Sequence, residues 1–77
     1  MVLLSKKGCH LCEAVEAEIR EMPSLKLKVL DIEADRTLHD KYWMTIPVLR
    51  LEGVDIFDAR MMDAGGRWKK KLASLLS

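Results

Sequence analysis

The sequence contains two cysteines, Cys9 and Cys12, with His10 and Leu11 between them. A disulfide between them would close a very short loop and constrain the unfolded chain little, because the entropy that a crosslink removes grows with loop length. The spacing suits chemistry better, since side chains at this helical spacing lie on one face, close enough for two sulfurs to bond. We therefore interpret the pair as reactive thiols rather than as a structural crosslink.

The position of Cys9 indicates which thiol reacts first. An apolar run over residues 1–5 is typical of a buried strand, residues 6–8 interrupt it, and an amphipathic helix is predicted from residue 9 to about residue 20. A helix N-terminus stabilises a thiolate through its partial positive charge and unpaired N–H groups, so we expect the pKa of Cys9 to lie below its free value of about 8.5. Cys9 would then attack a target disulfide, and Cys12 would attack the Cys9 sulfur to release the reduced target.

The same two cysteines could instead form half of a metal site. A zinc site needs about two further ligands, and the sequence holds only His10 and His39 and no second pair of cysteines. A C-x-x-C motif between a strand and a helix favours redox chemistry, so we predict no metal ligands. His10 could help to stabilise the Cys9 thiolate as an imidazolium or could simply face solvent, and we expect His39 at the surface.

The composition limits the remaining classes of function. The chain has 77 residues, 49% of them hydrophobic and 32% charged, with a net charge of +1, which predicts a single globular domain over residues 1–77. Neither a strong basic excess, a spanning apolar segment nor a signal-peptide pattern is present. We therefore expect a cytoplasmic monomer that binds neither nucleic acid nor membrane.

The rest of the chain alternates between helical and extended patterns. We predict a strand over 25–32, a helix over 34–43, a hairpin of strands 47–51 and 54–59, and a final helix. The features on which these predictions depend are Pro23 as a helix stop, Leu38 and Tyr42 on one helix face, the turn Glu52-Gly53, and the stripe Trp68, Leu72, Leu75 and Leu76. The β-α-β-α-β-β-α order predicts an α/β fold with a four-stranded mixed sheet and helices on both faces.

Three motifs taken together resemble a known family. They are Ser5-Lys6-x-Gly8-Cys9-x-x-Cys12, Thr45-Ile46-Pro47-Val48 and Gly65-Gly66. In order and spacing they are similar to the glutaredoxin branch of the thioredoxin superfamily, and most similar to its short bacterial glutaredoxin-like proteins. The resemblance covers nearly the whole chain and implies a thioredoxin-like fold and a dithiol–disulfide oxidoreductase that acts in thiol redox homeostasis.

The resemblance also implies roles for individual residues. Cys9 would be the nucleophile and Cys12 the resolving thiol. Pro47 would be a cis-proline held against the cysteines, which would leave the Ile46 backbone free to pair with an extended peptide or with glutathione. The other residues of the implied substrate or glutathione site are Lys6 beside the thiols, His10, Gly65 and Gly66. The sequence departs from the usual glutaredoxin pattern in the His10-Leu11 pair and in Arg67-Trp68 after the glycines.

No tightly bound cofactor is implied, and glutathione would be a co-substrate. The expected partners are a disulfide-containing protein or a glutathione mixed disulfide, with a thioredoxin-reductase-type enzyme as a further source of electrons. Two alternatives remain open at this point. One is a small electron carrier or adaptor for a larger enzyme with weak use of glutathione, and the other is a metal-binding module built on Cys9 and Cys12.

Overall fold

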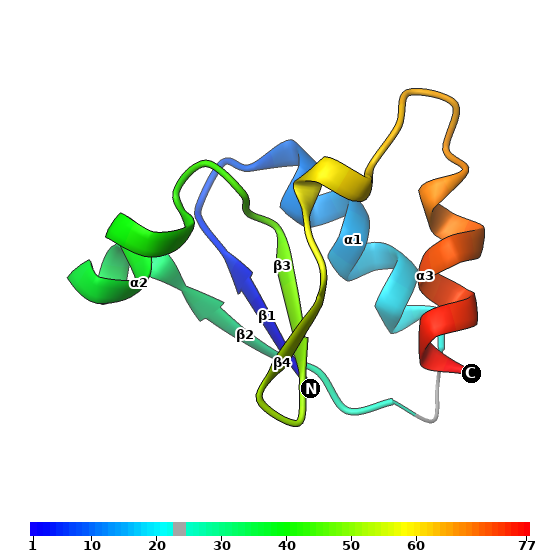
Figure 1. Cartoon of the computed structure of the whole chain (residues 1–77), viewed down its shortest axis with the longest axis horizontal. Coiled ribbons are helices and arrows are strands. Elements are labelled where there is room, and N and C mark those ends of the chain that lie inside the picture. The colour runs from blue at the N-terminus through cyan, green and yellow to red at the C-terminus, as the bar shows by residue number, and fades with distance from the viewer. Residues whose placement is uncertain (23–24) are drawn as a thin grey trace.

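The computed structural model describes residues 1–22 and 25–77, which form a four-stranded sheet in the order β2-β1-β3-β4 with helices on both faces (Figure 1). The elements are β1 (Val2–Ser5), α1 (His10–Arg20), β2 (Lys28–Asp31), the 3-10 turn η1 (Ile32–Ala34), α2 (Arg36–Tyr42), β3 (Val48–Leu51), β4 (Val54–Phe57), the 3-10 turn η2 (Ala59–Met61) and α3 (Trp68–Leu76). This mixed α/β architecture confirms the predicted fold class and is consistent with a thioredoxin-like fold.

Strand direction brings four connecting segments to one end of the sheet. β1 runs parallel to β2 with Ser5 opposite Asp31, and antiparallel to β3 with Leu4 opposite Val48. β3 in turn runs antiparallel to β4. The chain therefore leaves β1, β2 and β4 at the same end at which it enters β3. We call this the loop end of the sheet, and it is the end at which residues 6–9 follow β1.

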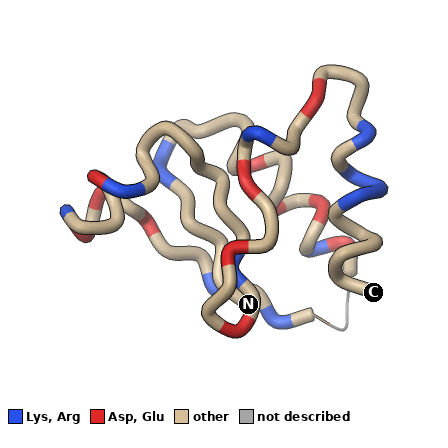
Figure 2. Tube along the Cα trace, viewed as in Figure 1, with Lys and Arg blue, Asp and Glu red and all other residues tan. Residues whose placement is uncertain are grey.

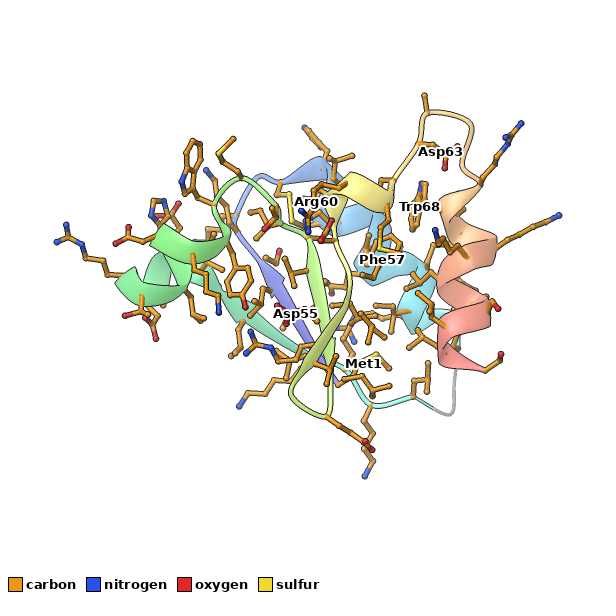
Figure 3. The ribbon with its side chains drawn as sticks, viewed as in Figure 1. Met1, Asp55, Phe57, Arg60, Asp63 and Trp68 are labelled. Atoms are coloured by element: carbon orange, nitrogen blue, oxygen red, sulfur yellow. A yellow bond between two sulfur atoms is a disulfide. The ribbon has the colours of Figure 1, made fainter. Side chains whose placement is uncertain are left out.

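Two apolar clusters cover the two faces of the sheet. The cluster under α1 and α3 consists of Leu3, Val15, Ile19, Leu49, Phe57, Trp68 and Leu72. The smaller cluster under α2 consists of Leu4, Ile32, Tyr42 and Val48. Successive strand residues point to opposite faces, which is why neighbours such as Leu3 and Leu4 are both fully buried but belong to different clusters. On β4, Asp55 points toward α2 and Phe57 toward α1 and α3 although they are two residues apart, because the register of β4 with β3 shifts between them (Figure 3).

The strand predicted over 25–32 is wrong in length and pattern. Only Lys28–Asp31 is extended. Val29 is 38% exposed, although its alternation with lysines in the sequence predicts that it faces the core. β2 is an edge strand, so little covers Val29 on the α1 face. On the other face, Leu30 packs against the cluster that contains the buried Ile32. The lysines at this edge agree with its solvent exposure.

The start of α2 and the burial pattern of α3 also differ from the prediction. α2 begins at Arg36 because the Asp35 carboxylate accepts hydrogen bonds from the N–H groups of Thr37 and Leu38, and the residues before it form η1. On α3, Trp68 and Leu72 are buried as predicted, but Leu75 is 41% exposed. Pro23, which was predicted to end the first helix, lies outside the described residues.

The hairpin confirms the predicted turn at Glu52-Gly53. Both residues have positive φ, 52° and 80°, as the tight two-residue turns that match the twist of paired strands require.

Basic residues gather along α3, whereas charges of both signs follow one another elsewhere on the trace (Figure 2). Within the described residues, no helix has both the length and the apolar character needed to cross a membrane.

Candidate functional site

The two cysteines lie where the chain enters α1 at the loop end. Their Cα atoms are 5.2 Å apart, and their sulfurs lie at disulfide-bonding distance. Cys9 is the N-cap residue of α1, and its sulfur accepts a hydrogen bond from the Cys12 N–H at 3.2 Å. Cys12 is 1% exposed, whereas Cys9 is only partly buried. A partner molecule can therefore reach the Cys9 sulfur more readily than the Cys12 sulfur.

The segment before the cysteines is shaped by a glycine. Gly8 has a φ of 76°, in the left-handed region, which glycine adopts readily because it has no Cβ. The Cys9 N–H then donates to the Lys6 carbonyl at 3.3 Å, which closes the turn from β1 into α1. Residues 6–8 thus direct Cys9 to the helix N-terminus, as their strand-breaking composition predicted.

The charged side chains near the cysteines are engaged with other groups. Lys6 Nζ lies 3.7 Å from Glu33 Oε1 of η1, and His39 Nε2 lies 4.0 Å from the same oxygen. The side chain of His10 is 95% exposed, with Nδ1 3.6 Å from Glu13 Oε2. The structure therefore directs Lys6 toward η1, and it places His10 in solvent on the first turn of α1.

The Thr45-Ile46-Pro47 segment reaches the loop end from the other side. The Ile46–Pro47 peptide bond is cis, and Pro47 is fully buried. The register of β1 with β3, continued beyond Leu4 and Val48, brings this segment beside the residues that follow β1. The Ile46 N–H donates to the Tyr42 carbonyl at 3.1 Å. This corrects the expectation that the whole Ile46 backbone is free, because only its carbonyl is left to pair with an extended chain.

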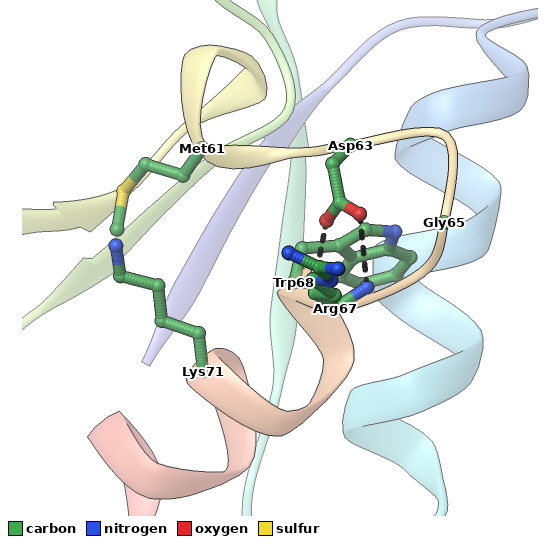
Figure 4. Close-up of a pocket in the computed structure, with 6 residues that line it drawn as sticks. All are labelled: Met61, Asp63, Gly65, Arg67, Trp68 and Lys71. Carbon is green, nitrogen blue, oxygen red and sulfur yellow. Dashed lines mark hydrogen bonds between the residues drawn. The ribbon is translucent and has the colours of Figure 1, made fainter.

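The two glycines lie in the loop before α3, and the residue that organises this loop is Asp63. Its carboxylate accepts hydrogen bonds from the N–H groups of Arg67 at 3.1 Å and Trp68 at 2.8 Å (Figure 4). Burial alone would raise the pKa of Asp63, but the hydrogen bonds from these N–H groups outweigh it and lower the pKa below its usual value. Sequence analysis missed Asp63, because it lies four residues before Arg67, the N-cap of α3, and not at the position where a capping carboxylate is expected.

An open hollow of about 440 Å³ lies beside this loop. It is lined by Met61, Asp63, Gly65, Arg67, Trp68 and Lys71, and Figure 4 shows the side chains of Lys71 and Met61 pointing toward each other. Of the two glycines, Gly65 lines the hollow. Lys6, Ile46 and Pro47 lie at the loop end with the cysteines, whereas the glycines belong to the α3 loop.

Two further features were not singled out as site residues. Trp43 and Met44, directly before Thr45, are 59% and 74% exposed, whereas the neighbouring Tyr42 is buried. The second feature is a hydrogen-bonded group formed by Tyr42, Arg50 and Asp55. Charged residues on a hairpin give no signal in the sequence of which helix residue they contact.

No group of three or more histidine, cysteine, aspartate or glutamate side chains that could hold a metal ion occurs within residues 1–22 and 25–77. The chemistry that the described residues place together is therefore that of a thiol pair at a helix N-terminus, beside a cis-proline segment.

Comparison with known proteins agrees with this geometry. The family model of the glutaredoxin-like domain (DUF836) matches residues 1–75. No curated protein and no solved structure matches the chain. The match spans nearly the whole chain, and the protein therefore belongs to the glutaredoxin-like domain family.

Proposed function

We propose that this member of the glutaredoxin-like family is a dithiol–disulfide oxidoreductase in which Cys9 is the nucleophile and Cys12 the resolving thiol. One observation carries the proposal: the partly exposed Cys9 sulfur caps α1 and accepts the Cys12 N–H, while Cys12 is buried within disulfide-bonding distance. A thiolate at that position gains from the N–H group and from the helix dipole.

The reaction proceeds in two exchanges. The Cys9 thiolate attacks one sulfur of the substrate disulfide, forms a mixed disulfide and expels the other sulfur as a thiolate, which takes up a proton. Cys12 then loses its proton and attacks the Cys9 sulfur, forming the Cys9–Cys12 disulfide and releasing the second substrate thiol. Two electrons and two protons pass from the protein to the substrate. Thiols such as glutathione, or a thioredoxin-reductase-type enzyme, reverse the same exchanges and restore the dithiol.

The proposed substrates are protein disulfides and glutathione mixed disulfides. An extended substrate segment would accept no hydrogen bond from Ile46, because that N–H is already bonded, and would instead donate one to the Ile46 carbonyl. The ion pair between Lys6 and Glu33 is half exposed and therefore weak. Lys6 would leave this ion pair to bind a substrate carboxylate.

The test is equilibration of the purified protein in graded glutathione redox buffers, followed by acid quench and intact-mass measurement. We expect a cooperative loss of two hydrogens as the buffer becomes oxidising. In the Cys12→Ser variant we expect a mixed disulfide with glutathione or with an added peptide disulfide, and the matched Cys9→Ser variant should trap none. Thiols that stay reduced across the series, with no adduct in either variant, would contradict the proposal.

The exposed Trp43 and Met44 favour a second candidate, in which the protein carries electrons to a larger enzyme and uses glutathione weakly. Large apolar side chains on a surface are typical of protein contacts, and tryptophan and methionine are enriched there. The two candidates differ in which disulfide Cys12→Ser traps. Capture of a protein disulfide at a rate far above that for glutathione disulfide would favour the carrier, and the reverse order would favour a glutathione-dependent enzyme.

A further inference from the structure

The side chains of Tyr42, Arg50 and Asp55, from α2, β3 and β4, are all hydrogen-bonded to one another. The Tyr42 hydroxyl donates to Asp55 Oδ2 at 2.8 Å and accepts from Arg50 Nη2 at 2.6 Å, while Arg50 Nε donates to Asp55 Oδ1 at 2.9 Å. Arg50 and Asp55 are directly opposite each other in the β3–β4 pair, and Tyr42 is the last residue of α2. The group therefore fastens the C-terminal end of α2 to the hairpin.

The group is well suited to hold Tyr42 in one position. Tyr42 is 7% exposed and packs with Leu4, Ile32 and Val48, so its ring has little freedom. Burial alone would raise the pKa of Asp55, but the hydrogen bonds from Arg50 and Tyr42 lower it below its usual value. Asp55 is therefore charged at neutral pH, and hydrogen bonds to a charged acceptor are stronger than neutral ones.

The backbone of the same tyrosine organises the segment that reaches the reactive pair. The Tyr42 carbonyl accepts from the N–H of Thr45 at 2.9 Å, the N–H of Ile46 at 3.1 Å and the Thr45 hydroxyl at 3.4 Å. The Thr45 carbonyl is held in turn by the Ala59 N–H of η2 at 3.0 Å. The hydroxyl of Tyr42 thus binds the hairpin, and its carbonyl binds Thr45 and Ile46, so Tyr42 links the two segments.

We propose that Tyr42, Arg50 and Asp55 are positioning residues, which set the affinity for extended disulfide substrates by fixing the Thr45-Ile46-Pro47 segment. The inference rests on the proposed oxidoreductase function. None of the three side chains forms a hydrogen bond with a cysteine sulfur. A substrate chain that pairs with the Ile46 carbonyl needs that carbonyl at a fixed position. If the Thr45-Ile46-Pro47 segment were mobile in the free protein, ordering it would cost part of the binding free energy and weaken the affinity. A disulfide too small to reach Ile46 gains nothing from this order.

The experiment compares two substrates in three variants. Tyr42→Phe keeps the buried ring and removes the hydroxyl, and Asp55→Asn keeps the shape of the acceptor and removes its charge. Arg36→Gln is the matched control, because it breaks the Arg36–Asp40 ion pair on the same helix, 94% and 66% exposed, without touching Tyr42. The substrates are a short cysteine peptide linked to a second copy by a disulfide, and 2-hydroxyethyl disulfide.

We expect KM for the peptide disulfide to rise about three- to tenfold in Tyr42→Phe and Asp55→Asn with kcat nearly unchanged, which corresponds to a loss of substrate binding. The rate with 2-hydroxyethyl disulfide and the potential of the Cys9–Cys12 couple should stay at the wild-type values. Hydrogen exchange of the Thr45 and Ile46 amides should become faster in the same two variants. Arg36→Gln should change none of these quantities.

Two results would overturn the positioning role. One is a peptide KM that stays within twofold of the wild type in both variants. The other is an equal loss of rate with both substrates or a shifted potential, since either would show a general disturbance of the domain. A wild-type protein that exchanges with neither substrate would instead refute the proposed oxidoreductase function, and the positioning role would fall with it.

Discussion

The difference between the two thiols can be measured directly on the reduced protein. The Cys9 sulfur is partly exposed and accepts the Cys12 N–H at 3.2 Å, whereas Cys12 is 1% exposed on the inner face of α1. The thiolate, and not the thiol, is the nucleophile that attacks an alkylating reagent. The structure therefore predicts that a limiting amount of iodoacetamide modifies Cys9 much faster than Cys12.

The size of the difference follows from two contributions, one that favours the Cys9 thiolate and one that disfavours the Cys12 thiolate. A negative charge at a helix N-terminus gains about 0.3–1 kcal/mol, and up to about 2 kcal/mol when partly buried. A gain of about 1.4 kcal/mol raises the thiolate fraction of Cys9 about tenfold at neutral pH. Burial of Cys12 disfavours its thiolate and limits access. We therefore expect Cys9 to react at least about tenfold faster.

The assay uses the single-thiol variants Cys12→Ser and Cys9→Ser, reduced and freed of reductant, with alkylation followed by intact mass at neutral pH. The same variants unfolded in urea give the rate of each thiol without the helix. The folded Cys12→Ser variant should react faster than its unfolded form, and the folded Cys9→Ser variant should react more slowly than its own. Equal rates for the two folded variants, or faster reaction at Cys12, would refute the assignment of Cys9 as nucleophile.

Three further predictions concern stability and partner contact. In a Cys12→Ser background under reducing conditions, Cys9→Ala should lower the free energy of unfolding by about 0.5–2 kcal/mol relative to Cys9→Ser, because alanine cannot cap α1; equal urea midpoints would contradict this. The lowered pKa of Asp55 stabilises the fold above the pKa of the unfolded carboxyl, ordinarily 3.8, and this contribution is lost as pH falls through the folded pKa. Urea midpoints of the wild type and Asp55→Asn should therefore converge in acid, and a constant gap down to strong acid would count against the network. Trp43→Ser should change the unfolding free energy by less than about 0.5 kcal/mol but slow exchange with a protein disulfide; an unchanged rate in that kinetic assay would remove Trp43 from the partner surface.

Much of the fold could be predicted because its elements follow local patterns. Val15 and Ile19 recur at helical spacing and both are buried under α1, and Glu52-Gly53 supplies the backbone conformation that its hairpin needs. β2 could not be predicted in the same way. Whether Val29 is covered depends on which strand lies at the edge of the sheet, and edge position is a property of strand order rather than of local sequence.

In the candidate site, too, residues in local motifs could be predicted, whereas contacts that depend on the tertiary fold could not. The cysteine motif and the Ile46-Pro47 pair are short motifs, so their residues could be named from the amino-acid sequence alone. The partners of Tyr42 could not, because the two-residue turn pairs Arg50 with Asp55 but no local pattern indicates that the end of α2 lies beside that pair. The bonded N–H of Ile46 escaped prediction for a related reason, since its acceptor is a backbone carbonyl at the end of α2 and carbonyls carry no sequence signal.

The three strands that end at the loop end are each followed by a side chain that accepts a backbone N–H. Asp31 accepts from Glu33 after β2, Asp58 from Arg60 after β4, and the Cys9 sulfur from Cys12 after β1. At Cys9 the capping atom is also the atom that we propose to react, so the proposal implies that the strength of the cap depends on redox state. A thiolate is a better acceptor than a disulfide sulfur, because charge strengthens the hydrogen bond. For the proposed dithiol couple, we predict that this hydrogen bond stabilises the reduced form, and each 1 kcal/mol of such stabilisation would move the potential by about 20 mV toward a stronger oxidant.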